Sequence, residues 1–321
     1  MEPLVSVHIT TYNQRDFIGK AIDSALSQIT DFPVEVVVGD DFSTDGTREL
    51  LNKYKNDYPG KVILNLMPER GKGMIGRSNF EATLQLCRGK YLAFLDGDDY
   101  WTNDDKLSEQ VRFLENNPEF VLCHHDCEAQ LTEGVKFKKD FSKKHAVTGF
   151  YEACQMTVPF MSSILIRREG IDFFDRRKWL EGLDLGDFAL WIMASLKGKS
   201  YYIDKEMAHY RVNHSSITGK LGYSVQVKNR MLFAERLAKS DYTIDRKFLS
   251  NYLSRYYFQY SGISLSKRDI PGIFKYAYKS MTSFFRGVSF GKKDYEWVKR
   301  LRWYVLVRLY MANFSKALKP S

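Results

Sequence analysis

Hydrophobic positions repeat with two different periods along roughly the first 125 residues of the chain. Short apolar runs such as Leu4–Thr10 and Val34–Asp40 predict buried β-strands, and the stretches between such runs place apolar residues on one helical face. The runs that predict strands are 4–10, 34–40, 61–67, 90–96 and 120–126, and those that predict helices are 16–28, 47–54, 79–89 and 105–117. Strands that alternate with helices predict an α/β fold, with a mostly parallel sheet flanked by helices.

The pattern changes near residue 220. Beyond it, long stretches rich in Tyr, Phe, Lys and Arg replace the short apolar runs, and 223–241 and 246–264 each have the pattern of an amphipathic helix. We therefore expect two domains, an α/β domain over 1–219 and a basic, aromatic-rich helical extension over 220–321.

Charge is distributed unevenly between these two parts. The chain has a net charge of +9, but 220–321 contain 21 Lys and Arg against 6 Asp and Glu, a net charge of +15, which leaves −6 for 1–219. A basic surface of this kind suits anionic lipid or an anionic acceptor. The extension is expected to pack on the first domain or on a second subunit, or to dock on a membrane. Nucleic-acid binding is disfavoured because the aromatic residues have core-like helical spacing and no binding motif is present.

The cysteine content and the N-terminal residues indicate the cellular compartment of the protein. Four cysteines in 321 residues imply no disulfide framework and are compatible with a reducing cytosol. The first residues, MEPLVSVHIT, lack the pattern of a signal peptide, and no stretch approaches about 18 uncharged apolar residues. We expect a cytoplasmic protein, with the inner face of the membrane as a peripheral docking surface.

Acidic and hydroxyl residues gather where three predicted strands end. These ends read TTYN (10–13), GDDFSTDGT (39–47) and DGDD (96–99). Because the carboxyl ends of parallel strands meet at one edge of a sheet, five carboxylates are expected to face one cleft there: Asp40, Asp41, Asp96, Asp98 and Asp99. This much negative charge needs a cation, and Mg²⁺ is held by one or two carboxylates together with substrate phosphates. Asp45, within STDGT, is better explained as a turn and capping residue.

Three segments together resemble the family 2 glycosyltransferases of the GT-A fold: VSVHITTYNQRDFIGKAIDSALSQ, VEVVVGDDFSTDGT and GKYLAFLDGDDYW. Each contains a predicted strand and its end, and the resemblance extends over about 4–213. It implies an inverting, metal-dependent enzyme of the type that builds bacterial surface polysaccharides. Such an enzyme moves a hexosyl or N-acetylhexosaminyl group from a nucleotide sugar, here expected to be UDP-linked, to a growing surface glycan or a lipid-linked saccharide. The implied cofactor is a divalent cation, Mn²⁺ or Mg²⁺.

The same resemblance assigns the first two strand ends to the nucleotide. Thr10 and Tyr12 match positions that hold the base and the ribose. Asp41 matches a carboxylate that accepts a hydrogen bond from the base. Arg77 and Asn79 lie in GMIGRSNF, where the family places basic or amide residues near the nucleotide.

The third strand end and a later segment match a cation and diphosphate site. Asp96 and Asp98 match the family's D-x-D pair, with Asp98 as the more direct metal ligand. The segment MAHYRVNHSSIT resembles a Y-R-x-H segment of the family, so Arg211 is expected to contact the diphosphate. His214 is expected as a further metal ligand or phosphate donor, with a surface histidine in a polar loop as the competing explanation.

The resemblance also predicts a general base at the start of a helix. The family has an E-D dipeptide there, which EGLDLGDFALWIMASLKG lacks. We assign Asp187 as the base and Asp184 as the alternative, and the structural explanation for either is a helix N-cap. Residues 161–163 are expected to line the acceptor side. The cluster CHHDC (123–127) is not interpreted as a metal site, because neighbouring residues of a strand point to opposite faces.

Two other functions fit parts of the sequence. A nucleotidyltransferase of a related α/β fold usually carries a glycine-rich loop after its first strand, whereas TTYNQRD contains no glycine. A degenerate, non-catalytic partner of another glycosyltransferase is expected to lack the acids, and Asp41, Asp96, Asp98 and Asp187 are all present. Both interpretations are weaker than the glycosyltransferase one.

Overall fold

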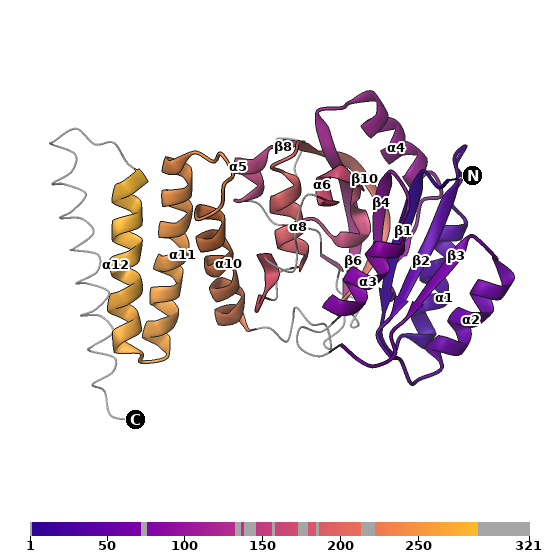
Figure 1. Ribbon diagram of the computed structural model, residues 1–321, viewed down its shortest axis with the longest axis horizontal. Helices are drawn as coiled ribbons and strands as arrows, with labels where there is room; N and C mark the ends of the chain where they lie inside the picture. The colour runs from indigo at the N-terminus through magenta and orange to yellow at the C-terminus, as the bar shows by residue number, and fades with distance from the viewer. Residues whose placement is uncertain are drawn as a thin grey trace. The chain divides into compact units, whose positions relative to one another are not determined.

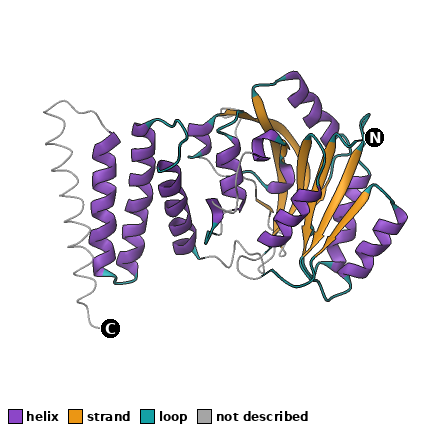
Figure 2. Ribbon diagram, in the orientation of Figure 1, coloured by secondary structure: helices purple, strands orange, loops and turns teal. Residues whose placement is uncertain are grey.

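The computed structural model of the protein describes residues 2–71, 76–131, 136–137, 146–155, 158–172, 179–183, 186–212 and 222–287. The chain divides into two compact units, Met1–Lys220 and Leu221–Ser321. Figure 1 labels the helices and strands of each unit, and Figure 2 distinguishes them by colour.

A ten-stranded sheet forms the centre of the first unit. Its main path has the order β3-β2-β1-β4-β9-β6-β10-β5, while β7 pairs with β6 and β8 pairs with β10. The strands are β1 (Val5–Thr11), β2 (Val34–Asp40), β3 (Val62–Leu66), β4 (Tyr91–Asp96), β5 (Tyr100–Trp101), β6 (Phe120–Leu131), β7 (Lys136–Phe137), β8 (Val147–Thr148), β9 (Leu165–Arg167) and β10 (Lys199–Val212). The long pairings, β1 with β2 and β4, β2 with β3, and β6 with β10, are parallel. The predicted α/β fold with a mostly parallel sheet is confirmed.

Helices cover both faces of this sheet (Figure 2). Those described in the first unit are α1 (Arg15–Leu26), α2 (Thr47–Asp57), α3 (Arg77–Leu86), α4 (Lys106–Asn116), α5 (Phe150–Ala153), α6 (Glu169–Asp172) and α8 (Gly186–Ala194), with a 3-10 turn, η2 (Met161–Ser163). On one face, Ile22 of α1 and Leu107 of α4 join Val7 of β1 in a single buried cluster. On the other face, Phe80 of α3 packs against His8 of β1, with 4.4 Å between ring centroids. Alternate residues of β1 therefore point to opposite helical layers.

The end of α3 differs from the prediction. The helix stops at Leu86, and Gly89 is no part of its C-terminal cap. Gly89 is required by packing instead, because a Cβ there would lie 2.5 Å from the backbone nitrogen of Ser6 on β1. The Gly89 N–H also donates to Ser6 Oγ at 2.7 Å.

The second unit contains three described helices, α10 (Tyr223–Ala238), α11 (Arg246–Ser266) and α12 (Ile270–Gly287). The first two confirm the helices predicted for 223–241 and 246–264. Glu235 of α10 links all three helices, because it accepts hydrogen bonds from Tyr257 Oη of α11 at 2.6 Å and from Lys279 Nζ of α12 at 3.1 Å. Ser280 of α12 also donates to the Ser254 carbonyl of α11 at 2.8 Å.

Candidate active site

The three polar strand ends lie side by side at one edge of the sheet. Thr10 of β1 is in register with Gly39 of β2 and with Asp96 of β4. The Gly97 N–H donates to the Thr10 carbonyl at 2.9 Å, and the Asp41 N–H donates to the Thr11 carbonyl at 3.0 Å. The convergence predicted from the sequence is therefore present in the fold.

Gly97 holds the D-G-D-D turn (96–99) close to the end of β1. A Cβ at this position would lie 2.5 Å from Gln14 Oε1 and 2.9 Å from both Cβ and Oγ1 of Thr11. Such contacts are shorter than van der Waals packing allows, so only glycine permits this approach. Thr11 Oγ1 and Gln14 Oε1 lie 2.9 Å apart, which fixes the wall that the turn packs against.

Carboxylates from two distant parts of the chain converge beside this turn. Burial first, and then the negative charges of Asp98 and of Asp187, raise the pKa of Asp96 to about 7. Asp187 lies in the first turn of α8, where its Oδ1 accepts a hydrogen bond from the Phe188 N–H at 2.7 Å. The side chain of Asp187 is exposed. A solvent-accessible carboxylate thus lies within electrostatic reach of the D-G-D-D acids.

Tyr210 of β10 is a site residue for which the sequence analysis named no role. The pKa of its phenol is raised by burial first, and then by the four carboxylates of Asp96, Asp99, Asp98 and Asp187. Its ring packs against Phe160, with 4.5 Å between centroids. Its position directly before Arg211 in HYRV was the only available sequence signal.

Arg211 holds the D-G-D-D turn through its backbone and its side chain. Its N–H donates to Asp99 Oδ1 at 2.8 Å, and its Nε donates to the Asp98 carbonyl at 3.2 Å. The guanidinium lies 4.3 Å from the ring centroid of Phe17 on α1. Burial raises the pKa of Asp99 well above its usual value, and Asp96 adds to this, while the Arg211 N–H opposes it. His214 and Asp184 lie outside the described residues.

The turn η2 lies beside the same acids. The Ser162 hydroxyl lowers the pKa of Asp99, against the larger effect of burial. The Ser162 carbonyl accepts a hydrogen bond from Trp101 Nε1 at 2.9 Å, and the Ser163 carbonyl accepts one from Gln110 Nε2 at 2.9 Å. That 161–163 line the acceptor side stays a prediction.

The residues predicted to bind the nucleotide lie next to a segment that the sequence analysis did not single out. Arg70 stacks on Tyr12, with its guanidinium 3.8 Å from the ring centroid, and donates to Tyr12 Oη at 3.0 Å. The buried carboxylate of Asp41 accepts a hydrogen bond from the Gly71 N–H at 3.2 Å. Arg77, at the start of α3, donates to the Leu183 carbonyl at 2.6 Å and so contacts the segment before α8.

Two residues near these strand ends have structural roles instead of the expected place in the site. Asp40 was grouped with the cleft acids, but it is fully buried and accepts hydrogen bonds from Arg48 Nε at 2.6 Å and from the Ser43 N–H at 2.9 Å. Asn79 is also buried and donates to the Gly39 carbonyl at 2.9 Å. Through these hydrogen bonds, both side chains fix the end of β2.

Asp45 behaves as predicted for a turn and capping residue. It accepts hydrogen bonds from the Thr47 N–H at 3.0 Å and from the Arg15 N–H at 3.1 Å, which ties the starts of α2 and α1 together.

A divalent cation is compatible with the acid pair, although the described residues form no complete metal centre. Within the described ranges, no group of three or more His, Cys, Asp or Glu side chains is arranged to hold a metal ion. The negative charge of Asp98 contributes to the raised pKa of Asp96. Mg²⁺ is typically held by only one or two carboxylates, so a pair of this kind is enough to bind it. In CHHDC, Cys123 lies in the core, while His124 packs edge-on against Trp191.

Comparison with known proteins identifies related sequences. The family model described as "Glycosyl transferase family 2" matches residues 6–173. The uncharacterized protein Rv1520 of Mycobacterium tuberculosis is 38% identical over 132 residues, 41% of this chain, and the match spans only 37% of that protein. The glucosyltransferase WfaP of Escherichia coli, named as acting from UDP-Glc on GlcNAc-diphosphoundecaprenol, is 29% identical over 67% of this chain and 80% of its own length. The putative teichuronic acid biosynthesis glycosyltransferase TuaG of Bacillus subtilis is 30% identical over 68% of this chain and 82% of its own.

Solved structures show the same fold. TarS (residues 1–349) of S. aureus in complex with UDP-GlcNAc superposes with a TM-score of 0.63 at 19% identity, covering 88% of this chain and 82% of that one. The mannosyltransferase PcManGT of Pyrobaculum calidifontis, in complex with GDP-Man and Mn²⁺, gives a TM-score of 0.52 at 18% identity over 98% of this chain and 88% of its own.

Proposed function

Because the chain belongs to glycosyl transferase family 2, we propose that it is a glycosyltransferase that moves a sugar from a UDP-linked donor to a growing surface glycan or a lipid-linked saccharide. The observation that carries the proposal is that the D-G-D-D acids, in the turn after β4, and Asp187, on α8, converge beside Tyr210. The activities for which WfaP and TuaG are named, and the UDP-GlcNAc bound to TarS, support a uridine donor and a saccharide acceptor. Residues 1–219 form the catalytic domain in this proposal.

The end of the first two strands binds the nucleotide in this proposal. Tyr12, with Arg70 stacked on it, and Thr10 hold the base and ribose, while Asp41 accepts a hydrogen bond from the base. Arg77 and Arg211 offer guanidinium groups to the phosphates, since their planar donors suit phosphate oxygens.

A divalent cation, Mn²⁺ or Mg²⁺, fits the second part of the site. Asp96 and Asp98 supply its carboxylate ligands, with His214 as a further ligand. The pKa of Asp96 is raised to about 7 by burial and by neighbouring acids, so a cation at this place would restore its charged form. When bound, the metal stabilises the charge that develops on the leaving diphosphate.

Asp187 is the general base in this proposal. Its exposed carboxylate takes the proton from the acceptor hydroxyl as that oxygen attacks the anomeric carbon, and direct attack inverts the configuration there. Asp184 is the alternative base.

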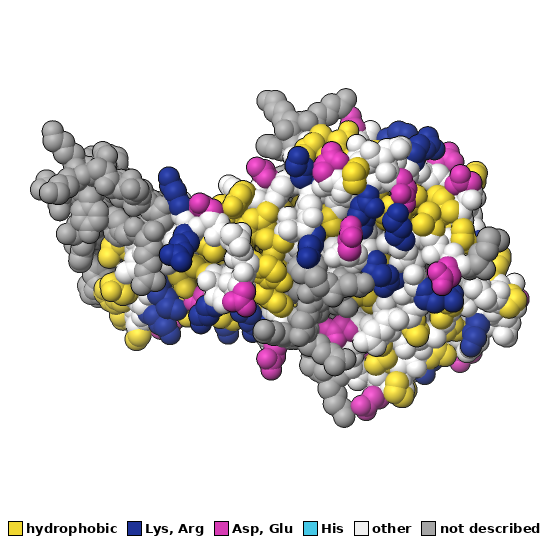
Figure 3. All heavy atoms as spheres, turned by 45° about the horizontal axis from the view of Figure 1, so that its top comes forward, with side chains coloured by type: hydrophobic (Ala, Val, Ile, Leu, Met, Phe, Trp, Pro, Cys, Tyr) yellow, Lys and Arg dark blue, Asp and Glu magenta, His cyan; other side chains and the backbone are white. Residues whose placement is uncertain are grey.

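We also propose that the helical extension, 220–321, docks on the inner face of the membrane. Three exposed apolar residues, Ile270, Phe274 and Tyr278, follow one another every four residues along α12. Figure 3 shows hydrophobic and basic side chains side by side on the visible part of this unit. None of the described helices is long and apolar enough to cross a bilayer. A second copy of the chain is the alternative partner for this face.

The activity is tested with UDP-sugars, Mn²⁺ and a diphosphoundecaprenol-linked saccharide, with release of UDP as the readout. Wild type is expected to release UDP from one donor in an acceptor-dependent way. Asp187→Asn should lower the rate by about 10²–10⁴ because it cannot accept the proton, while UDP affinity stays unchanged.

Asp184→Asn is the control for that variant, and it should keep its activity. Full activity in Asp187→Asn would show that a residue other than Asp187 is the general base. No UDP release from any donor would contradict the proposed function.

A further inference from the structure

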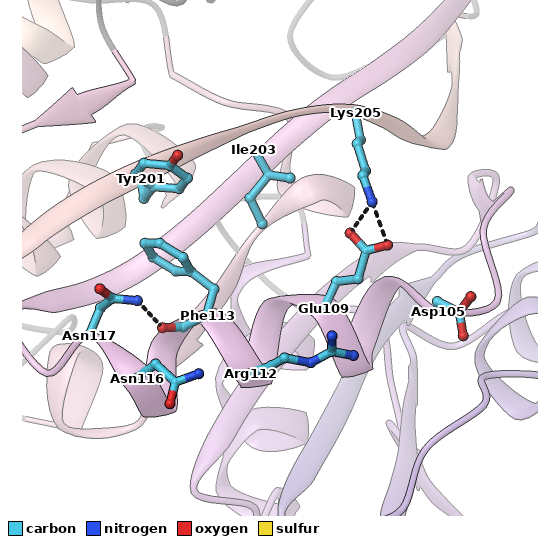
Figure 4. Close-up of a pocket in the computed structure, with 9 residues that line it drawn as sticks. All are labelled: Asp105, Glu109, Arg112, Phe113, Asn116, Asn117, Tyr201, Ile203 and Lys205. Carbon is cyan, nitrogen blue, oxygen red and sulfur yellow. Dashed lines mark hydrogen bonds and ion pairs between the residues drawn. The ribbon is translucent and has the colours of Figure 1, made fainter.

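A hollow lies between α4 and β10 (Figure 4), and none of the residues that line it belongs to the strand-end site. Its volume of about 570 Å³ lies within the range of small-ligand sites. The floor is formed by Phe113 of α4 and by Tyr201 and Ile203 of β10, all partly buried. The rim is polar and includes Asp105, Glu109, Arg112, Asn116 and Lys205. We call this feature the α4–β10 groove.

The aromatic rings of the floor are held in place by their packing on one another. The rings of Phe113 and Tyr201 stack with 4.3 Å between centroids and 20° between planes. Phe120 packs edge-on against both, at 5.2 Å from Phe113 and 5.7 Å from Tyr201. Aromatic surface that is already ordered loses little entropy when a ligand binds. The C–H groups of a pyranose ring suit an apolar floor of this kind.

The rim offers planar hydrogen-bonding groups. Arg112 and Asn116 lie one helical turn apart on α4, and both are exposed. Among the residues that the structure describes, neither side chain has a hydrogen-bond or ion-pair partner. Lys205 Nζ donates to both carboxylate oxygens of Glu109 at 2.7 Å, an exposed pair of the kind that contributes little to stability and can rearrange. Guanidinium, amide and carboxylate groups pair well with vicinal hydroxyls.

The charges of the rim select among ligand classes. Asp105 and Glu109 balance Arg112 and Lys205, so the groove has no net charge. A polyanion such as a nucleic acid would meet two carboxylates here, whereas a neutral saccharide meets matched donors and acceptors.

The groove shares the strand β10 with the candidate active site. Lys205 and Arg211 are on the same strand, β10, about 20 Å apart at the usual rise per residue. The helix α4 begins shortly after β5, whose residues Tyr100 and Trp101 directly follow the D-G-D-D turn. An acceptor saccharide would reach the groove if it extended over about this distance from the strand ends along β10.

We infer that the α4–β10 groove binds a neutral oligosaccharide, namely a segment of the acceptor glycan behind its reacting end; this rests on the proposed function. It would give the enzyme a preference for acceptors that are already extended, because a second contact raises the local concentration of the reacting end.

The test is a calorimetric titration of the full chain with neutral tetra- and hexasaccharides of glucose and of N-acetylglucosamine. The double variant Arg112→Ala/Asn116→Ala removes two exposed rim groups and leaves the floor intact. It should weaken binding of the best oligosaccharide about tenfold. The matched control, Asn52→Ala/Lys53→Ala, removes an exposed amide and an exposed cation from α2 and should bind like wild type.

UDP is titrated into the same samples as a separate readout. UDP binding with no oligosaccharide binding, or equal oligosaccharide affinity in wild type and the Arg112→Ala/Asn116→Ala variant, overturns the groove inference and leaves the proposed function intact. Oligosaccharide binding that the rim variant weakens, with no binding of UDP, supports the groove and contradicts the UDP-linked donor.

Discussion

At the scale of single residues, the acids at the strand ends of the first unit fall into two groups, according to whether nearby donors stabilise their charged forms. Asp40 and Asp45 are satisfied by nearby donors and serve the fold. Asp96 and Asp99 have raised pKa values, because burial and neighbouring carboxylates disfavour their charged forms. Perturbed groups that gather at one strand edge are typical of functional sites. The sequence showed which acids were present, but it did not show that Asp40 would find Arg48 as its partner.

Lys106 is a buried base outside this cluster. Its side chain is fully buried, donates to Gln110 Oε1 at 2.7 Å and lies 4.1 Å from the Trp101 ring centroid. Burial lowers the pKa of Lys106 to about 7. Above this pH the unfolded chain still binds a proton that the folded chain has lost, so this group makes stability rise with pH up to its unfolded pKa.

Lys106→Met should remove that pH dependence. Between pH 7 and 9, the free energy of unfolding of wild type should rise by about 2 kcal/mol more than that of the variant. Urea denaturation of both proteins at the two pH values measures the difference. Parallel changes in the two proteins would show that Lys106 stays charged in the fold.

At the scale of elements, the sequence predicted the strands and helices whose apolar pattern is unbroken. The runs that became β1, β2, β3 and β4 are short, apolar and bounded by polar turns, so their period is clear. β10 was missed because Lys199–Val212 mixes charged and apolar residues, and its pairing with β6 shifts register three times. β9 was missed because three residues are too few to show a period. Tyr210 and the α4–β10 groove depend on β10, so neither was predictable from the sequence.

The D-G-D-D turn gives a prediction at this scale. Gly97→Ala places a Cβ 2.9 Å from Thr11 Cβ, so the turn must shift and carry Asp98 with it. Binding of UDP with Mn²⁺ should weaken at least about tenfold, and the free energy of unfolding should fall by about 1–3 kcal/mol.

Calorimetry and urea denaturation measure both effects of Gly97→Ala. Gly262→Ala in α11 is the control, because nothing lies within 4 Å of its added Cβ and the helix should be stabilised slightly. Unchanged UDP binding in Gly97→Ala would show that the turn does not position the cation site.

At the scale of the whole molecule, the acidic site and the basic extension lie in separate parts of the chain. The net charge is −6 for 1–219 and +15 for 220–321. The exposed apolar residues of α12 and the basic charge of its unit together suit an anionic lipid surface, since apolar insertion and electrostatic attraction add.

This membrane proposal predicts binding to phosphatidylglycerol vesicles that weakens with salt, and little binding to phosphatidylcholine vesicles. Substituting Ile270, Phe274 and Tyr278 by Ser should weaken vesicle binding about tenfold or more in co-sedimentation. The control substitutes Ser for Ile29 and Tyr58, two exposed apolar residues of the first unit.

Equal vesicle binding in the two variants would exclude the α12 face as the membrane contact. A fall in apparent mass of the α12 variant on size exclusion would instead assign that face to a second copy of the chain.

The central claim is that the D-G-D-D strand end binds a cation together with a uridine nucleotide. Calorimetric titration of UDP with and without Mn²⁺ tests it most directly, in wild type, in Asp98→Ala and in the control Asp57→Ala, which alters an exposed acid of α2. We expect Mn²⁺ to strengthen UDP binding in wild type and in the control, and this gain to disappear in Asp98→Ala. UDP binding that is absent in wild type, or that responds to Mn²⁺ equally in all three proteins, would contradict the claim.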